Sequence, residues 1–142
     1  MRRGWSIAAI VAVAIALGTV FFVRGRQRVI TRPLIPVAQV RAPEGVRIRV
    51  QILNATKTRG LARRATALLR DRGFDVVETG TLTQTRDTTL VLDLSGHADW
   101  ANRIAQILAP ATVTARQDSS RYLDIAVVLG NSWRPPAQPF NP

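Results

Sequence analysis

The stretch "VRIRVQILNATKTRGLARRATALLRDRGFDVVET", residues 46–79, changes its hydrophobic period along its length. Its first part alternates apolar and polar residues, which predicts a strand with one solvent-facing side. After a turn of Asn, Thr and Gly, apolar residues recur at helical spacing, and we expect a helix over about 58–72. "FDVVET", residues 74–79, is apolar and β-branched and is predicted to be the next strand. The residues expected on the inner face of the first strand are Val46, Ile48, Val50 and Ile52.

The helix predicted over 58–72 has an apolar stripe opposite an arginine-rich face. Gly73 follows it and is suited to end it. The stripe that we expect to face the core consists of Leu61, Ala65, Leu68 and Leu69, with Ala62 beside them.

The remainder of the domain repeats the alternation of strand and helix. "TTLVLDL" (88–94) and "YLDIAVVLG" (122–130) are predicted strands, and "ATVTAR" (111–116) is a predicted short edge strand. A second helix is expected over about 97–109, ended by Pro110. The order is β-α-β-β-α-β, a split β-α-β pattern of the α/β (α+β) class, with a sheet of about 4–5 strands and both helices on one face. The expected core residues of the second helix are Ala101, Ile104, Ala105 and Leu108.

An uncharged segment, "WSIAAIVAVAIALGTVFFV", occupies residues 5–23. A helix of this length spans about 30 Å, the thickness of the hydrocarbon core of a bilayer. A cleaved signal peptide is the alternative, but its apolar region is usually about 7–15 residues and ends at small residues. We therefore predict a retained transmembrane helix over 5–23, after a short cytoplasmic N-terminus, residues 1–4.

Prolines lie on both sides of the predicted domain. Three of the eight fall between residues 33 and 43, and four between 135 and 142. This distribution predicts a basic linker over 24–45, a domain over 46–133 and a disordered tail over 134–142.

The net charge of +11 is concentrated outside the predicted domain. Residues 46–133 hold 12 basic and 8 acidic side chains, which leaves +4 there and +7 outside. Contact with anionic lipid headgroups accounts for the flanking charge more simply than nucleic acid does. Counting Arg on the two sides of residues 5–23 by itself slightly favours a cytoplasmic location for the domain.

Groups that could support catalysis are scarce. The chain has no cysteine and one histidine, His97, so no metal cluster, cofactor or nucleotide loop is predicted. His97 and Asp99 are two residues apart and point to different sides of a helix. We expect His97 in the first helical turn, Asp99 interacting with the helix dipole and Ser95 as the cap. The sequence predicts a protein that is not an enzyme.

The turn between the first strand and the first helix is the strongest candidate for a ligand site. Asn54 and Thr56 can shape it through side-chain bonds to backbone, and Thr58 can cap the helix. Free N–H groups at the helix start favour an anion. The alternative is a plain connection with solvated basic residues. The candidate anion-binding residues are Asn54, Thr56, Lys57, Arg59, Gly60 and Arg63.

Four segments, in this order and spacing, resemble the LytR C-terminal domain family of cell-envelope proteins: "VQILNAT", "GLARRATALLRDRGFDV", "DTTLVLDLSGHADWANRIAQILA" and "DIAVVLGNSW". This domain is the non-catalytic one in such proteins. The resemblance implies a domain outside the cytoplasmic membrane behind a single N-terminal helix, and it outweighs the charge count. It also implies binding of peptidoglycan, an anionic envelope polymer or an envelope protein.

Two other functions stay open from the sequence. The first is a cytoplasmic domain that binds nucleic acid through its arginines. The second is an assembly factor that docks through a sheet edge, with residues 111–116 as the predicted edge. Trp100 and Trp133 are either glycan-stacking residues or core residues.

Overall fold

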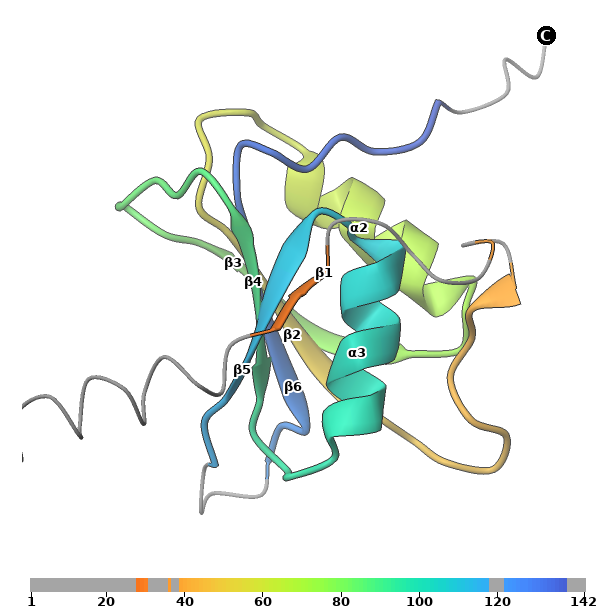
Figure 1. Ribbon diagram of the computed structural model, residues 1–142. Helices are drawn as coiled ribbons and strands as arrows, with labels where there is room; N and C mark the ends of the chain where they lie inside the picture. The colour runs from red at the N-terminus through yellow and green to blue at the C-terminus, as the bar shows by residue number, and fades with distance from the viewer. Residues whose placement is uncertain (1–27, 31–35, 37–38, 118–121, 138–142) are drawn as a thin grey trace, which may run out of the picture.

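Two helices cover one face of a six-stranded mixed sheet (Figure 1). The computed structural model describes residues 28–30, 36, 39–117 and 122–137. The elements are β1 (Arg28–Ile30), β2 (Arg49–Asn54), α2 (Leu61–Arg70), β3 (Asp75–Thr81), β4 (Thr89–Asp93), α3 (Ala98–Ile107), β5 (Ala111–Ala115) and β6 (Ile125–Leu129). The predicted α/β class and the predicted order of strands and helices within residues 46–133 are confirmed, and β1, which was not predicted, makes six strands where 4–5 were expected.

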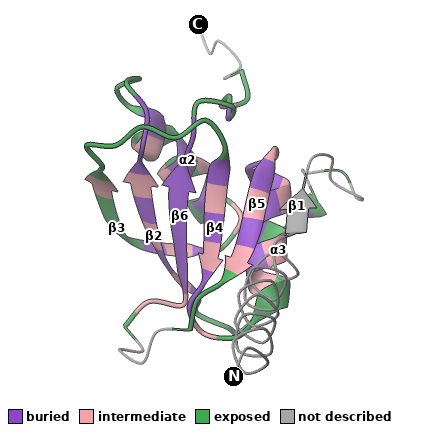
Figure 2. Cartoon of the chain, turned by 60° about the vertical axis from the view of Figure 1, so that its left-hand side comes forward, coloured by how far each residue is buried: buried purple, intermediate pink, exposed green. Residues whose placement is uncertain are grey.

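The strands lie in the order β1-β5-β4-β6-β2-β3. β2 pairs in parallel with both β3 and β6, and β4 pairs in parallel with β5. The two halves of the sheet join through the antiparallel pair β4–β6. Figure 2 shows this sheet face-on, with the helices behind it. β2, β3 and β6 therefore end at one pole of the domain, and β4 and β5 end at the other.

β1 comes from the segment predicted as a linker. It pairs antiparallel with β5, and Arg28 lies opposite Val113. The prediction that residues 111–116 form an edge strand is therefore wrong, because β5 has a partner on both sides. The edges of the sheet are β1 and β3. The hydrophobic pattern of residues 46–133 could not reveal β1, because β1 lies outside these residues.

The core lies between the sheet and the helices. Ile48, Val50 and Ile52 are fully buried as predicted, whereas Val46 is exposed because it precedes the strand. The core-facing residues expected on the second helix are all buried. On α2, Leu61, Ala65 and Leu69 are buried, and Ala62 and Leu68 pack beside them half-buried.

Both helices are shorter than predicted at both ends: α2 begins three residues later than expected and α3 one residue later, and each ends two residues earlier. α2 ends in a Schellman arrangement, in which Gly73 N–H donates to the Arg70 carbonyl and Phe74 N–H to the Leu69 carbonyl. Gly73 has a φ of 84°, a left-handed conformation that favours glycine. The predicted role of Gly73 as the helix stop is therefore confirmed.

The parts of the chain outside residues 46–133 are described only in places. No described helix is long and apolar enough to span a bilayer, and residues 5–23, predicted to do so, lie outside the described residues. At the other end, Pro135, Pro136 and Ala137 form a shallow groove with α2 residues Arg64 and Leu68. The first part of the predicted tail thus lies against the domain.

Candidate functional site

The turn after β2 is built around the side chain of Asn54. Its Oδ1 accepts hydrogen bonds from Thr56 N–H at 3.1 Å and from the Thr56 hydroxyl at 2.8 Å. Its Nδ2 donates to the Thr58 carbonyl at 2.9 Å, and Thr58 N–H donates to Thr56 Oγ1 at 3.1 Å. Asn54 and Thr56 are both 6% exposed, so they shape the turn from inside.

Neighbouring segments hold this turn through its backbone. Ala55 N–H donates to the Leu129 carbonyl at 3.1 Å, and Leu82 N–H to the Asn54 carbonyl at 2.9 Å. Arg86 N–H donates to the Ala55 carbonyl at 2.8 Å. The turn therefore keeps one shape, set by contacts to the ends of β6 and β3 and to the loop before β4.

The start of α2 differs from the prediction. The N-cap is Gly60, with φ 80°, and no side chain caps the helix, so the predicted Thr58 cap is wrong. The Thr58 carbonyl is instead held by Asn54. The N–H groups of the first helical turn have no partner within the helix and point out of its end, where the helix dipole is positive.

Lys57, Arg59 and Arg63 are exposed around this helix start. The candidate residues therefore fall into two groups. Asn54 and Thr56 form the buried frame, and Lys57, Arg59, Gly60 and Arg63 form the exposed surface. A shallow pocket at this place is lined by Asn54, Thr56, Lys57, Thr58, Arg59, Gly60, Ala62 and Thr81. It can accept an anion from solvent at an uncapped helix start.

The fold adds basic residues that sequence reasoning missed. Segments 55–60, 82–88 and 130–134 meet where β2, β3 and β6 end, and the first turn of α2 lies beside them (Figure 1). We call this end the basic pole. Its basic side chains are Lys57, Arg59, Arg63, Arg64, Arg86 and Arg134. Arg86 and Arg134 carry no local signal of this role, because only the hydrogen bonds between loops bring them here.

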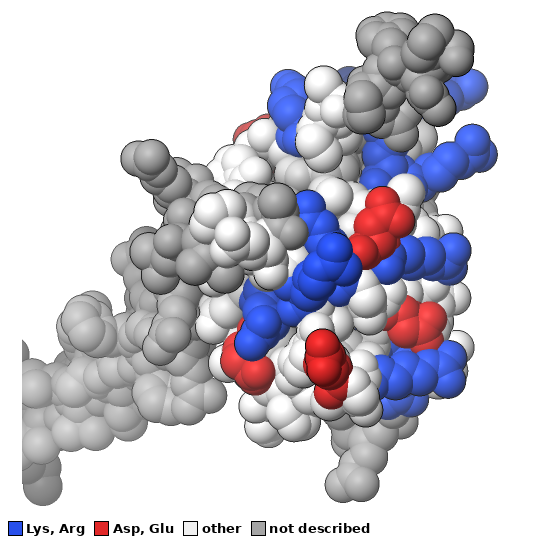
Figure 3. Space-filling model, turned by 90° about the vertical axis from the view of Figure 1, so that its right-hand side faces the viewer, with Lys and Arg blue, Asp and Glu red and all other residues white. Residues whose placement is uncertain are grey.

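The basic pole has little compensating negative charge. Asp87 is the acidic residue of the three segments that form it. The salt bridges of the described residues, Arg47–Asp75 at 2.6 Å and Arg49–Asp124 at 3.2 Å, lie at the amino ends of β2, β3 and β6. In Figure 3, Lys and Arg lie at the top, across the centre and at the lower right of the visible face, and most of the visible Asp and Glu lie in its lower half.

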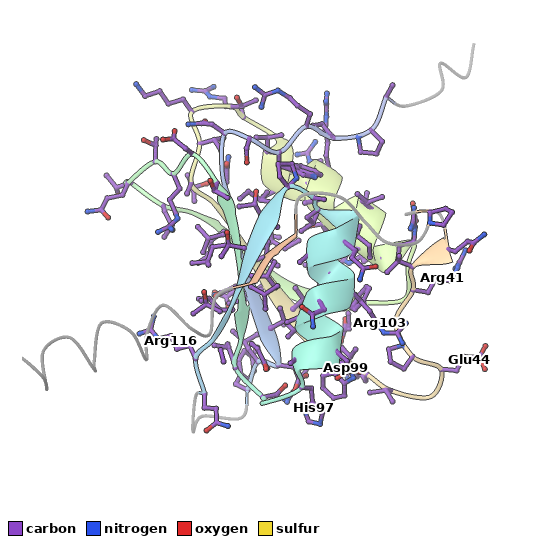
Figure 4. The ribbon with its side chains drawn as sticks, viewed as in Figure 1. Arg41, Glu44, His97, Asp99, Arg103 and Arg116 are labelled. Carbon is purple, nitrogen blue, oxygen red and sulfur yellow. The ribbon has the colours of Figure 1, made fainter. Side chains whose placement is uncertain are left out.

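His97 lies at the opposite end of the domain, at the start of α3 (Figure 4). Its ring stacks on Trp100, with centroids 3.8 Å apart, and its Nδ1 lies 3.1 Å from Ser95 Oγ. Asp99 is in the first turn of α3, as predicted. The predicted Ser95 cap is wrong, because the buried Asp93 carboxylate accepts the backbone N–H groups of residues 95, 96 and 97 instead.

The last candidates are the two tryptophans and a metal site. Trp133 is 1% exposed, so it is a core residue and offers no face to a sugar. Trp100 is half-buried against the core and on its other side meets His97. No group of three or more possible metal ligands occurs in the described part of the chain.

Comparison with known proteins identifies a family. Residues 47–133 match the family model described as "LytR cell envelope-related transcriptional attenuator". Among solved structures, the chain is similar to the soluble domain of a conserved hypothetical secreted protein from Mycobacterium marinum. That similarity has 21% identity and a TM-score of 0.47, and it covers 73% of this chain and 72% of that one. No curated protein matches the chain.

Proposed function

The chain belongs to the family of LytR cell envelope-related transcriptional attenuators, whose model matches more than half of it, and we propose that it presents a binding domain to the cell envelope. In this proposal residues 5–23 anchor the chain in the cytoplasmic membrane and residues 46–133 lie outside it. The domain binds an anionic envelope polymer and catalyses no reaction.

The basic pole is the observation that supports this proposal most directly. It combines exposed cations with the uncapped N–H groups of α2. Both features favour binding of a negatively charged group. They lie at one place because backbone hydrogen bonds join the turn at Asn54 to three neighbouring segments. A polymer with repeated phosphates or carboxylates can contact several of these cations at once, since they come from separate loops.

The chemistry of the pole supports binding without catalysis. The polar side chains beside its cations, Asn54 and Thr56, are buried and donate and accept within the turn. The histidine of the chain lies at the other pole. A site of this kind can hold a negative charge, and the side-chain partner of Asp87 among the described residues is the amide of Asn131, which is not a nucleophile.

Binding to purified cell-wall polymer tests the proposal. The full chain in detergent is mixed with peptidoglycan sacculi that carry their anionic glycopolymer, and with sacculi stripped of it. We expect the chain to be retained by the first and to be lost from the second at moderate salt. Equal retention on both preparations would contradict an anionic ligand.

A matched pair of variants locates the binding surface. Lys57→Gln, Arg59→Gln and Arg63→Gln together remove three charges from the basic pole. Arg41→Gln, Arg103→Gln and Arg116→Gln remove the same number elsewhere, at residues that lie away from that pole (Figure 4). We expect the first variant to bind about tenfold more weakly, since each exposed pair contributes about 0.5 kcal/mol. Equal losses in the two variants would indicate nonspecific attraction.

Membrane topology separates this proposal from the nucleic-acid alternative. A reporter enzyme that is active only outside the cytoplasm is fused after Pro142. We expect activity from the fusion, and its absence would place the basic pole in the cytoplasm, where duplex DNA becomes the ligand to test.

A further inference from the structure

The register of β1 fixes how the chain approaches the domain. β1 runs antiparallel to β5, from Arg28 opposite Val113 to Ile30 opposite Ala111. Because Ala111 is the first residue of β5 and lies towards the basic pole, β1 runs towards the basic pole. A chain that continues straight back from Arg28 therefore leads away from the basic pole, towards the end of the domain where β4 and β5 end.

Little chain separates β1 from the predicted membrane segment. Only residues 24–27 lie between Val23 and Arg28. A fully extended chain from Val23 to Arg28 spans at most about 17 Å. A domain whose first strand begins so close to the anchor stays near the bilayer surface.

The end of the domain at which β1 begins is formed by two connected segments. We call it the α3 pole, formed by residues 94–97 and the described parts of the β5–β6 connection, 116–117 and 122–124. Arg116 N–H donates to the Asp93 carbonyl at 2.8 Å, and Leu94 N–H to the Asp124 carbonyl at 3.0 Å. A Cβ on Gly96 would lie 3.4 Å from the Gln117 side chain. The two segments therefore form one continuous surface.

The α3 pole exposes amphipathic aromatic residues. Tyr122 is 60% exposed, the most exposed of the large hydrophobic side chains described. His97 is exposed at the start of α3 (Figure 4), and its ring stacks on the half-buried Trp100. Tyr and Trp are enriched at the membrane–water interface, where one end of the ring is apolar and the other is hydrated.

The charges of the α3 pole are nearly balanced, in contrast with the basic pole. Arg116 is exposed there, Asp99 is exposed in the first turn of α3, and Asp124 is paired with Arg49. Asp93, Asp99 and Asp124 outnumber Arg49 and Arg116 by one at this end, but Asp93 is buried and Asp124 is paired, so the exposed charges of Asp99 and Arg116 balance.

From these observations we propose that the α3 pole contacts the lipid headgroups, with Tyr122 and the His97–Trp100 pair at the interface, so that the basic pole faces away from the membrane. This inference rests on the anchor of the proposed function and adds an orientation to it. It places the anion site on the side from which a wall polymer approaches.

Single-cysteine labelling tests the orientation in the full chain. The chain contains no cysteine, so Gln117→Cys at the α3 pole and Ser132→Cys at the basic pole each give one labelled site. Both positions are exposed. Each variant is reconstituted into phosphatidylcholine–phosphatidylglycerol vesicles that carry a nitroxide on the lipid headgroup, and the fluorescence of the label is measured. We expect the label at 117 to lose most of its fluorescence and the label at 132 to keep most of it.

A second pair of variants tests the aromatic contact. Tyr122→Ala is added to the 117-labelled chain, and Leu82→Ala, which truncates an exposed apolar residue at the basic pole, serves as the control. We expect Tyr122→Ala to restore part of the fluorescence and Leu82→Ala to leave it unchanged. Equal quenching at 117 and 132, or stronger quenching at 132, overturns the proposal.

Flotation of the same vesicles distinguishes the possible failures. A chain that does not float with the vesicles lacks the anchor, and both the proposed function and this orientation are then wrong. A chain that floats, shows the expected quenching and binds no envelope polymer would disprove the ligand and leave the orientation standing.

Discussion

The Oδ1 atom of Asn54 accepts two hydrogen bonds from Thr56, one from its N–H and one from its hydroxyl. Through this pair, the end of β2 determines the shape of the turn that leads to the uncapped start of α2. The exposed cations of the basic pole are thus supported by a buried polar contact.

Replacing Asn54 with alanine should destabilise the domain. The change removes three side-chain hydrogen bonds and leaves the buried Thr56 hydroxyl without one of its partners. At about 1 kcal/mol a bond, we expect a loss of about 3 kcal/mol in the free energy of unfolding, measured by urea denaturation. Asn131→Ala, at an exposed asparagine of the same pole, is the control and should change stability by less than about 0.5 kcal/mol.

Gly130 and Gly60 should respond very differently to alanine. A Cβ at Gly130 would lie 2.4 Å from the Thr88 carbonyl carbon, so the backbone must move and we expect a cost of about 3 kcal/mol. At Gly60 nothing lies within 4 Å, and only the positive φ opposes alanine, at about 1 kcal/mol. Thermal unfolding of the two variants measures the difference, and equal costs would mean that the close approach to Thr88 is wrong.

Asp93 should be needed for the loop that starts α3. Its carboxylate is buried and accepts three backbone N–H groups, so Asp93→Ala leaves those donors without this acceptor and should cost about 3 kcal/mol. Asp93→Asn retains one side-chain oxygen and should cost less. Hydrogen exchange at residues 95–97 should accelerate in the alanine variant, and unchanged exchange there would contradict the predicted role.

Removing β1 should expose the edge of β5. A chain that begins at residue 28 keeps the strand, and one that begins at residue 36 loses it. We expect faster amide exchange at Val113 only in the shorter chain, because its N–H faces β1, whereas the N–H of Thr112 faces β4 and should exchange at the same rate in both chains. Similar exchange at Val113 in both chains would show that β1 contributes no stable pairing.

Polymer binding at the basic pole should weaken as salt rises. The cations there are exposed, so their attraction to a polyanion is screened within about 8 Å at physiological ionic strength. We expect affinity to fall steadily with added sodium chloride, and to fall less steeply in the variant that lacks Lys57, Arg59 and Arg63. A ligand held mainly by apolar contacts would instead bind as well or better at high salt.

Much of the fold could be predicted from the periodicity of hydrophobic residues along the sequence. The alternation of Ile48, Val50 and Ile52 and the helical spacing of Leu61, Ala65 and Leu69 place these side chains in the core, as the structure does. Local turn chemistry was less reliable. Thr58 and Ser95 were expected to cap helices, but Asn54 and Asp93 hold those turns from preceding strands.

The sequence alone determined the class of fold, the order of its elements and the faces they bury, because periodicity depends on neighbouring residues along the chain. Tertiary structure decided which loops share a pole and which strands form the edges, because those properties depend on pairing between distant segments. Arg86 and Arg134 join Lys57 at the basic pole through loop contacts, and β1 covers β5 from outside the predicted domain. No local pattern contains these relationships.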